Sequence, residues 1–298
     1  MVKVPPRGIL TVLIEPFRDV NFRQLLIFLG AWNFVSNLAA PFFTVYMLQR
    51  IGLSMTLVLV FSVVSQAANA VFFQVWGRLA DRFSNKTVLS EAGPLFLLSI
   101  LLFPFTTMPE SYSLTIPFLI IIHVLAGVSS AGVMLCSGNI AIKLAPQGKA
   151  TSYLAVNALI SGMMATIAPI LGGLAADWFA QQELSLILKW ASKTAHETLE
   201  VPAISLRGLD FLFMIAFLLG LYALHRLVLI QEVGEIEEDI LISELHGLVR
   251  KVVKNATNVA GLRQFFFFPY GRLMELLIPP KLPADESDLL EYDGQETL

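Results

Sequence analysis

Six long apolar stretches dominate this sequence and limit what it can fold into. Each is about 20 or more residues long and carries few charges, which is the length that a helix needs to cross the hydrocarbon core of a bilayer. Together they predict an all-α, polytopic membrane bundle of six transmembrane helices. The stretches are residues 24–48, 55–76, 87–107, 116–144, 151–176 and 209–230.

The composition agrees with a membrane protein and disagrees with a soluble one. Hydrophobic residues make up 56% of the chain and charged residues only 14%, whereas a soluble domain carries about 25% charged residues. The only cysteine, Cys136, lies inside an apolar stretch, so no intrachain disulfide can form. Residues 1–23 mix proline and acids with apolar residues and lack a cleavable signal pattern, so we expect the first span to direct insertion.

The placement of lysine and arginine predicts the topology, because cytoplasmic loops carry an excess of both. With the N-terminus in the cytoplasm, only four basic residues face outside, namely Arg50, Lys189, Lys193 and Arg207. We therefore expect a cytoplasmic lead (1–23), a six-span transmembrane domain (24–230) with an outside loop (177–208), and a cytoplasmic tail (231–298). Both termini are then cytoplasmic.

The outside loop and the tail carry weaker signals. Residues 179–195 place Leu184, Ile187 and Trp190 at helical spacing, which favours a helix lying on the membrane surface. In the tail, residues 236–259 predict an amphipathic helix. Residues 265–270 combine aromatics with flanking arginines, which suits the headgroup boundary, and the proline- and acid-rich residues 279–298 are typical of a disordered segment.

A charged turn at residues 77–86 separates the second span from the third. It contains Gly77, Leu79, Asp81, Arg82 and Lys86. The glycine allows two helices to approach and the chain to turn, and the basic residues keep the turn in the cytoplasm. A carboxylate at the membrane surface needs a cation or a helix N-terminus as its partner. A plain topogenic charge cluster is the simpler interpretation, but it does not explain the order of the residues.

That order resembles G-x-L-a-D-R-x-G-R-K, the signature loop of the major facilitator superfamily. Ser84 and Asn85 depart from it, standing where the pattern has glycine and arginine. In the fifth span, residues 168–173 resemble a G-P-x-x-G-G element of the same superfamily, with Ala168 in place of the first glycine. Residues 33–46 resemble the first span of a C-terminal half in bacterial permeases. The resemblance covers about residues 17–230.

The resemblance implies a permease of the bacterial plasma membrane that works by alternating access between two six-span halves. It implies that Asp81 latches the inner gate by docking near the start of the fifth span, and that the first, second, fourth and fifth spans line a central cavity. This chain supplies the spans of one half. A split subunit, a homodimer or a C-terminal fragment each accounts for that, and we favour an incomplete C-terminal half that needs a second six-span unit.

Polar residues within the spans are the candidates for contact with a solute. Each could equally be a partner in helix–helix hydrogen bonding. No carboxylate lies deep in a span, and His123 is the one titratable mid-span group, which we interpret as a packing residue. The cavity therefore suits a neutral or weakly polar solute. The candidates are Asn33, Asn37, Gln66, Asn69, Asn139, Asn157 and Ser161.

The sequence bears on three classes of function. A permease component is the leading hypothesis, and a non-transporting membrane scaffold built on the same half-fold is the alternative. An enzyme is not supported, because the sequence shows no metal-ligand cluster, nucleophile constellation or phosphate loop. We expect no catalytic residues, no metal, no cofactor and no nucleic-acid partner. The expected partners are a small solute, the lipid bilayer and the second six-span unit.

Overall fold

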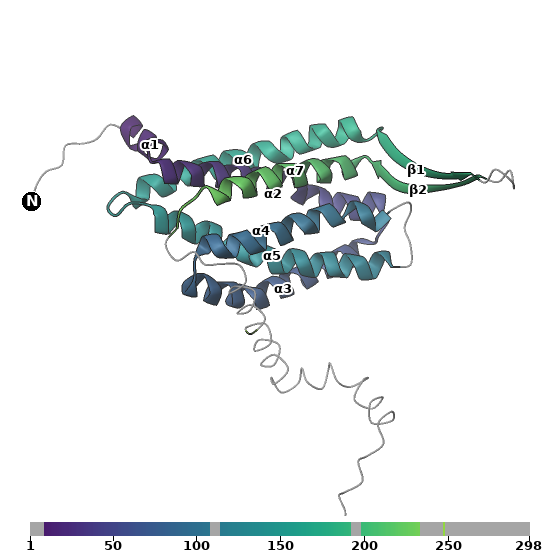
Figure 1. Ribbon diagram of the computed structural model, residues 1–298, viewed down its shortest axis with the longest axis horizontal. Coiled ribbons are helices and arrows are strands. Elements are labelled where there is room, and N and C mark those ends of the chain that lie inside the picture. The colour runs from purple at the N-terminus through teal and green to yellow at the C-terminus, as the bar shows by residue number, and fades with distance from the viewer. Residues whose placement is uncertain (1–8, 108–113, 192–197, 233–246, 248–298) are drawn as a thin grey trace, which may run out of the picture. The chain divides into compact units, whose positions relative to one another are not determined.

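The computed structural model describes residues 9–107, 114–191, 198–232 and 247, and six of its helices are long and apolar enough to cross a membrane (Figure 1). Each predicted span coincides with one of them, which confirms the all-α polytopic bundle. The elements are α1 (Ile9–Arg18), α2 (Val20–Val45), η1 (Tyr46–Arg50), α3 (Met55–Arg82), α4 (Asn85–Leu102), η2 (Pro104–Thr107), α5 (Thr115–Leu144), α6 (Ala150–Phe179), β1 (Glu183–Ala191), β2 (Thr198–Arg207) and α7 (Leu209–Val228).

Local sequence explains where the helices begin and end. Asp19 begins α2, because its side chain accepts hydrogen bonds from the backbone N–H groups of Asn21 and Phe22. At its far end α2 continues into the π-helical turn η1. Ser84 caps α4 in the same way as Asp19 caps α2, so only two residues separate α3 from α4.

The first three spans and the last three make equivalent helix–helix contacts. α2 packs on α6 and α7, whereas α5 packs on α3 and α4, and α4 contacts α7 between the two sets (Figure 1). Exchanging α2 with α5, α3 with α6 and α4 with α7 leaves this pattern unchanged. Two three-helix units related in this way are the arrangement of transporters built from inverted repeats.

Glycines let these helices approach closely. A Cβ at Gly93 would meet Leu224 at 2.5 Å, and one at Gly220 would meet Leu97 at 2.2 Å, so α4 and α7 each hold a leucine of the other against a glycine. At Gly127 of α5 the nearest atom is a backbone oxygen of α3. Small residues at the contacts are typical of membrane helices, which gain little from hydrophobic burial against one another.

The outside loop forms a β-hairpin, and the helix predicted for residues 179–195 is wrong. β1 pairs antiparallel with β2 from Glu183 opposite Arg207 to Ala191 opposite Thr198, with an irregularity between Leu186 and Ile187. Residues 183–186 alternate polar and apolar side chains, which is the period of a strand. The helical interpretation ignored that alternation and the second strand, which supplies the hydrogen-bonding partner.

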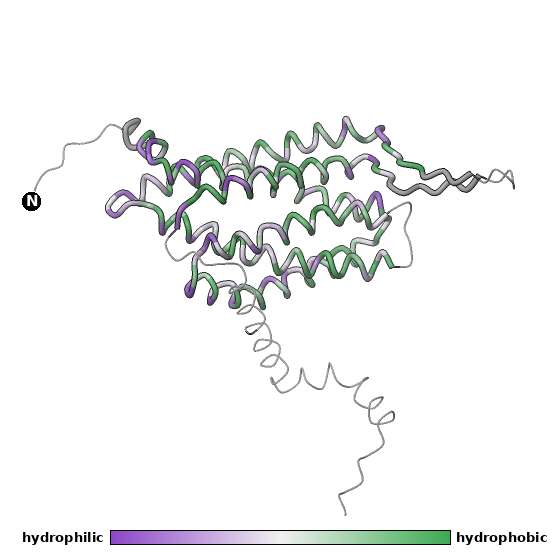
Figure 2. The backbone as a smooth tube through the Cα atoms, viewed as in Figure 1, coloured by the Kyte–Doolittle hydropathy of each residue, from purple (hydrophilic) through white to green (hydrophobic). Residues whose placement is uncertain are grey.

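Two of the spans, α3 and α6, are far less covered than the others. Only 11% of the most apolar stretch of each is buried, compared with 33–50% in the other four spans. The hydrophobic middle of every span is nevertheless evident (Figure 2). The exposed apolar side chains of α3 and α6 include Met55, Leu59, Val60, Val63, Val71, Leu159, Met163, Ile170 and Leu174.

Ahead of the spans, α1 occupies part of the predicted lead and contacts α2 and α6. Glu15 of α1 forms an ion pair with Lys149, just before α6. The proposals for residues 236–259, 265–270 and 279–298 of the tail lie outside the described residues, apart from the single residue Gly247.

Candidate functional site

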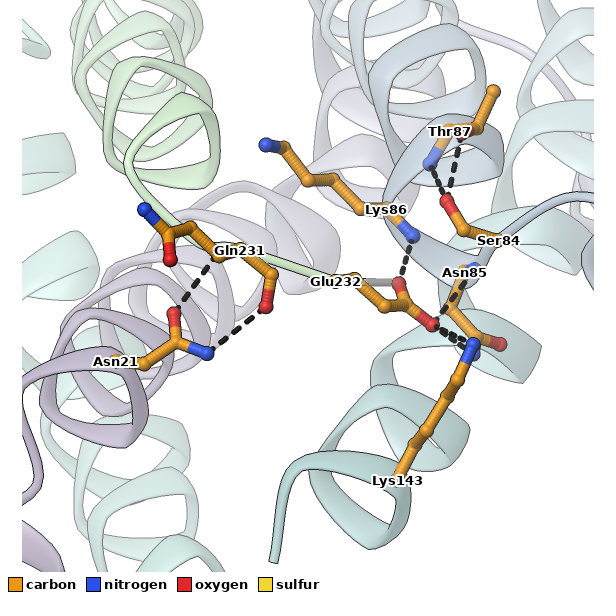
Figure 3. Close-up of polar contacts among 8 residues, drawn as sticks. All are labelled: Asn21, Ser84, Asn85, Lys86, Thr87, Lys143, Gln231 and Glu232. Carbon is orange, nitrogen blue, oxygen red and sulfur yellow. Dashed lines mark hydrogen bonds and ion pairs between the residues drawn. The ribbon is translucent and has the colours of Figure 1, made fainter. Parts of the chain in front are cut away.

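The turn between α3 and α4 lies at the end of the bundle that we call the motif end; the opposite end, which carries β1 and β2, is the hairpin end. At this turn Ser84 Oγ accepts a hydrogen bond from the N–H of Thr87 at 3.0 Å and lies 2.7 Å from its hydroxyl (Figure 3). Ser84 is fully buried. The cap fixes the start of α4, so the N–H groups of Asn85 and Lys86 both point toward the centre of the motif end.

The carboxylate of Glu232 accepts hydrogen bonds from both of these residues (Figure 3). Its Oε2 accepts the N–H of Lys86 at 2.7 Å, and its Oε1 accepts the N–H and the side-chain Nδ2 of Asn85 at 3.3 and 2.9 Å. Lys143, near the end of α5, pairs with the same Oε1 at 2.9 Å. One acid beyond α7 therefore joins the start of α4 to the end of α5.

Further hydrogen bonds hold the chain that follows α7. Lys86 Nζ donates to the carbonyl oxygens of Val228 and Ile230, at the end of α7, where a cation is favoured by the helix dipole. Asn21 and Gln231 exchange two hydrogen bonds, both 2.9 Å long, which joins the start of α2 to the same segment (Figure 3). The ends of α2, α4, α5 and α7 are thus held together; we call Asn85, Lys86, Lys143 and Glu232 the motif-end cluster.

The electrostatics of the cluster favour the charged form of Glu232. Burial raises the pKa of its carboxyl, but the hydrogen bonds from Lys143, from the Asn85 side chain and from the two N–H groups lower it by more, so the net pKa lies below its ordinary value. The Glu232 side chain is fully buried, whereas that of Lys143 is 44% exposed. An anion at a helix N-terminus, paired with a cation, is the stable state of this site.

The residues of the signature motif do not form one cluster in the structure. Gly77 lies within α3, not in the turn, and a Cβ there would make an ordinary contact of 3.6 Å with Leu135, so the glycine is not needed for the chain to turn. Leu79 is buried. Arg82 stacks its guanidinium over the ring of Phe83 at 5.2 Å, and Lys86 belongs to the cluster.

Asp81 does not make the contact that the resemblance implied. Its side chain is exposed, and within the described part of the chain its carboxylate forms no hydrogen bond or ion pair, including none with the start of α6. The central acid is Glu232, which the sequence analysis missed. Ser84 and Asn85, the two departures from the signature, are residues that build the cap and bind Glu232.

Four of the polar residues inside the spans form two interhelical pairs. Asn33 of α2 donates from Nδ2 to Ser161 Oγ of α6 at 3.2 Å and to the carbonyl of Leu29, and Asn37 donates to the carbonyl of Asn33. Asn69 of α3 donates to Ser130 Oγ of α5 at 3.0 Å. The exchange of helices that relates the two halves of the bundle also relates these pairs.

The remaining candidates are not brought together with those pairs by any hydrogen bond among the described residues. Gln66 of α3 and Asn139 of α5 are exposed. Asn157 of α6 is half-buried, and its Oδ1 is buried without a hydrogen-bond partner in the described chain. Ser130, which sequence reasoning missed, had a detectable signal as a small polar residue in the middle of an apolar span.

Comparison with known proteins decides the family. The family model of the Major Facilitator Superfamily matches residues 24–191, more than half of the chain. The chain belongs to the major facilitator superfamily. No curated protein and no solved structure was found to match it.

This membership confirms the resemblance drawn from the charged turn, and it makes the chain part of a family of membrane transporters. The match begins in α2 and ends in β1, so it covers five of the six spans and the turn at the motif end. The chain is therefore an integral membrane protein of a transporter superfamily with six candidate spans among its described residues.

Proposed function

We propose that this chain is a permease unit that moves a small solute by alternating access. The observation that carries the proposal is the polar content of the uncovered helices α3 and α6. Gln66 and Gln74 of α3 are exposed, although they lie in a membrane span. Thr166 of α6 is also exposed, but its hydroxyl is satisfied by the carbonyl oxygen of Gly162, so the two glutamines carry the argument. A polar side chain facing lipid is costly, so such residues face a water-filled cavity or a second protein surface.

That second surface belongs, in this proposal, to another six-span unit, either a separate half or a second copy of this chain. It would cover the exposed apolar side chains of α3 and α6 and enclose the polar ones in a central cavity. Asn33 and Ser161, together with Asn69, then line one wall through α2, α6 and α3. The wall carries amides and hydroxyls, which favours a neutral or weakly polar solute.

A photo-crosslinking amino acid tests the second unit. Placed at Val63 of α3, which is 67% exposed, it should form a protein adduct in native membranes, because this face meets the second unit. Placed at Leu218 of α7, which is also exposed, it should react mainly with lipid. The adduct should have twice the mass of the chain or contain a second six-span protein. Equal protein adducts at both positions would contradict the proposal.

Transport itself is tested in proteoliposomes. The full chain, alone and together with a candidate six-span partner, should take up at least one member of a broad panel of neutral and weakly polar solutes. Replacing Asn33 by alanine should weaken that uptake. If neither preparation moves any solute, the permease proposal fails. Within the described residues, no feature favours the scaffold alternative.

The motif end is the cytoplasmic end in this proposal, and the motif-end cluster holds the inner gate closed. In this proposal Asp81, which is exposed just before the same turn, extends the latch toward the second unit. The cytoplasmic assignment is supported by the concentration of basic residues at this end, which include Arg78, Arg82 and Lys86.

Replacing Asp81 by asparagine should shift the gate toward its open state. The measurement is the rate at which a thiol reagent labels a cysteine placed at Ala141 in a chain that carries Cys136→Ala. Ala141 is buried near the end of α5, so faster labelling reports that this end of the helix has become accessible. Asp177→Asn, at the hairpin end, is the matched control and should leave the rate unchanged. Identical labelling rates in the two variants would mean that Asp81 does not hold the gate and only belongs to a charge cluster that sets the topology.

A further inference from the structure

A cavity of about 580 Å³ opens at the hairpin end, away from the motif-end cluster and from the amide pairs of the spans. Its size is within the range of small-molecule sites. The walls are the end of α2 with η1, the end of α6, and the junction between β2 and α7. The lining residues that matter here are Tyr46, Gln49, Arg50, Asp177, Arg207 and Gly208.

Two arginines reach this cavity from different elements. Arg50 ends the π-helical turn η1, an irregularity that is frequent at functional sites. Its Nε is buried and donates no hydrogen bond to any described residue. Arg207 ends β2, and one of its terminal nitrogens is held by Glu183 at 2.6 Å. Since a guanidinium carries five N–H donors, both arginines retain donors for a ligand.

Carboxylates lie against the same cavity. Asp177 is exposed at the end of α6 and makes no hydrogen bond or ion pair through its side chain in the described chain. Asp210 is buried just beyond the lining residue Leu209. Its Oδ2 accepts the N–H of Arg207 at 2.9 Å, and both the phenol of Tyr46 and the charge of Arg50 act on its carboxylate.

Neither a simple anion nor a simple cation suits this arrangement. An anion would meet Asp177 and the field of Asp210, and a cation would meet Arg50 and Arg207. We propose that the cavity binds a zwitterionic group, with an oxyanion on the two guanidinium groups and an ammonium on Asp177. Arginine forks match the geometry of phosphate and carboxylate oxygens, and both pairings are charge-assisted.

The same chemistry could come from a soluble solute or from a lipid headgroup. The cavity lies at the hairpin ends of α2, α6 and α7, and the end of a helix that crosses a bilayer reaches the headgroups. A phosphate with an amine two carbons away carries both charges on one small group. O-Phosphoethanolamine is the soluble probe, and phosphatidylethanolamine presents the same group on a lipid.

The experiment measures binding to the purified full chain in detergent, followed by intrinsic tryptophan fluorescence, to which the exposed Trp178, next to Asp177 in sequence, contributes. O-Phosphoethanolamine should bind at least tenfold more tightly than either inorganic phosphate or ethanolamine. Arg50→Gln should weaken that binding about tenfold. Asp177→Asn should weaken the zwitterion while leaving phosphate unaffected or tighter. Arg78→Gln, an exposed arginine at the motif end, is the matched control and should change nothing.

A comparison of bilayers identifies the source. In nanodiscs of phosphatidylethanolamine the probe should be displaced if the headgroup is the ligand, whereas equal binding in phosphatidylglycerol and phosphatidylethanolamine nanodiscs identifies a soluble zwitterion. The inference is overturned if the zwitterion fails to bind, or if phosphate binds as tightly and Asp177→Asn has no effect. Because Asp177 is exposed, its variant tests the site even if Arg50→Gln misfolds. Binding here does not depend on transport, so the proposed function can fail independently.

Discussion

Replacing Gly127 by valine should break the contact between α3 and α5 and destabilise the bundle by about 3 kcal/mol, the upper range for overpacking a core. A Cβ at this position would lie 2.1 Å from the backbone oxygen of Ser65 and 2.8 Å from the Cβ of Ala68. A flexible side chain could rotate away, but a backbone oxygen inside a helix cannot. The two helices must therefore separate along their length, and even alanine should be costly.

The chain contains its own reporter for this experiment. Cys136 is the only cysteine, and it is buried in α5, the helix that carries Gly127. A thiol-reactive dye during a thermal ramp should therefore report the loss of packing around α5. The Gly127 variants should react at a temperature several degrees lower than the unsubstituted chain.

Gly138 of α5 provides the matched control, because a Cβ there has nothing within 4 Å. Gly138→Ala removes one glycine from the same helix and should leave the transition unchanged or raise it slightly, since alanine favours the helix. If Gly127→Ala and Gly138→Ala melt together, the close approach of α3 and α5 is not a determinant of stability.

The spans could be predicted from sequence because their signal is local. A run of twenty apolar, uncharged residues satisfies its backbone hydrogen bonds in a bilayer by forming a helix. Its hydropathy depends on its own composition and not on the segments that pack against it. The boundaries differed mainly at polar helix ends, such as the extension of α3 to Arg82, where arginine reaches water beyond the apolar stretch. The hairpin could not be found in the same way, because a strand depends on a partner that lies several residues further along the chain.

The motif-end cluster was only half predictable. The turn was identified because its residue types follow a family pattern in sequence order. Glu232 follows the last span and reaches α4 and α5 only when the six helices pack, so the contact has a sequence separation of 147 residues for Asn85. Lys143 was recognisable as a basic residue at a helix end, but its partner was not. The sequence therefore predicted Asp81, the acid that lies within the pattern, as the gate latch.

Replacing Glu232 by glutamine should release the motif end and cost about 2 kcal/mol of stability, the range for hydrogen bonds to a charged group. The amide keeps one acceptor oxygen but loses the charge that pairs with Lys143 and with the start of α4. Lys143 is partly exposed, so its freed charge can be solvated, and this limits the cost. The cysteine at Ala141 should be labelled faster than in the parent chain.

Two further variants distinguish the loss of the Lys143–Glu232 ion pair from nonspecific destabilisation of the protein. Lys143→Met should also speed labelling, but adding it to Glu232→Gln should change little more, since the pair is already broken. Glu183→Gln removes one partner of the exposed pair with Arg207 at the hairpin end and should leave labelling at Ala141 unchanged. Additive effects of Lys143→Met and Glu232→Gln would show that the two side chains do not act through one another.

The pH dependence provides a test that a purely steric role would not pass. The pKa of Glu232 is lower in the folded protein than its ordinary value of 4.5. Its contribution to stability is therefore fully present above pH 4.5 and is lost as the pH falls through the folded pKa. Thermal unfolding followed by tryptophan fluorescence should show the parent chain losing its advantage over Glu232→Gln only in that acidic range. A constant difference between the two chains from pH 7 down to pH 3 would mean that the charge of Glu232 does not hold the motif end together.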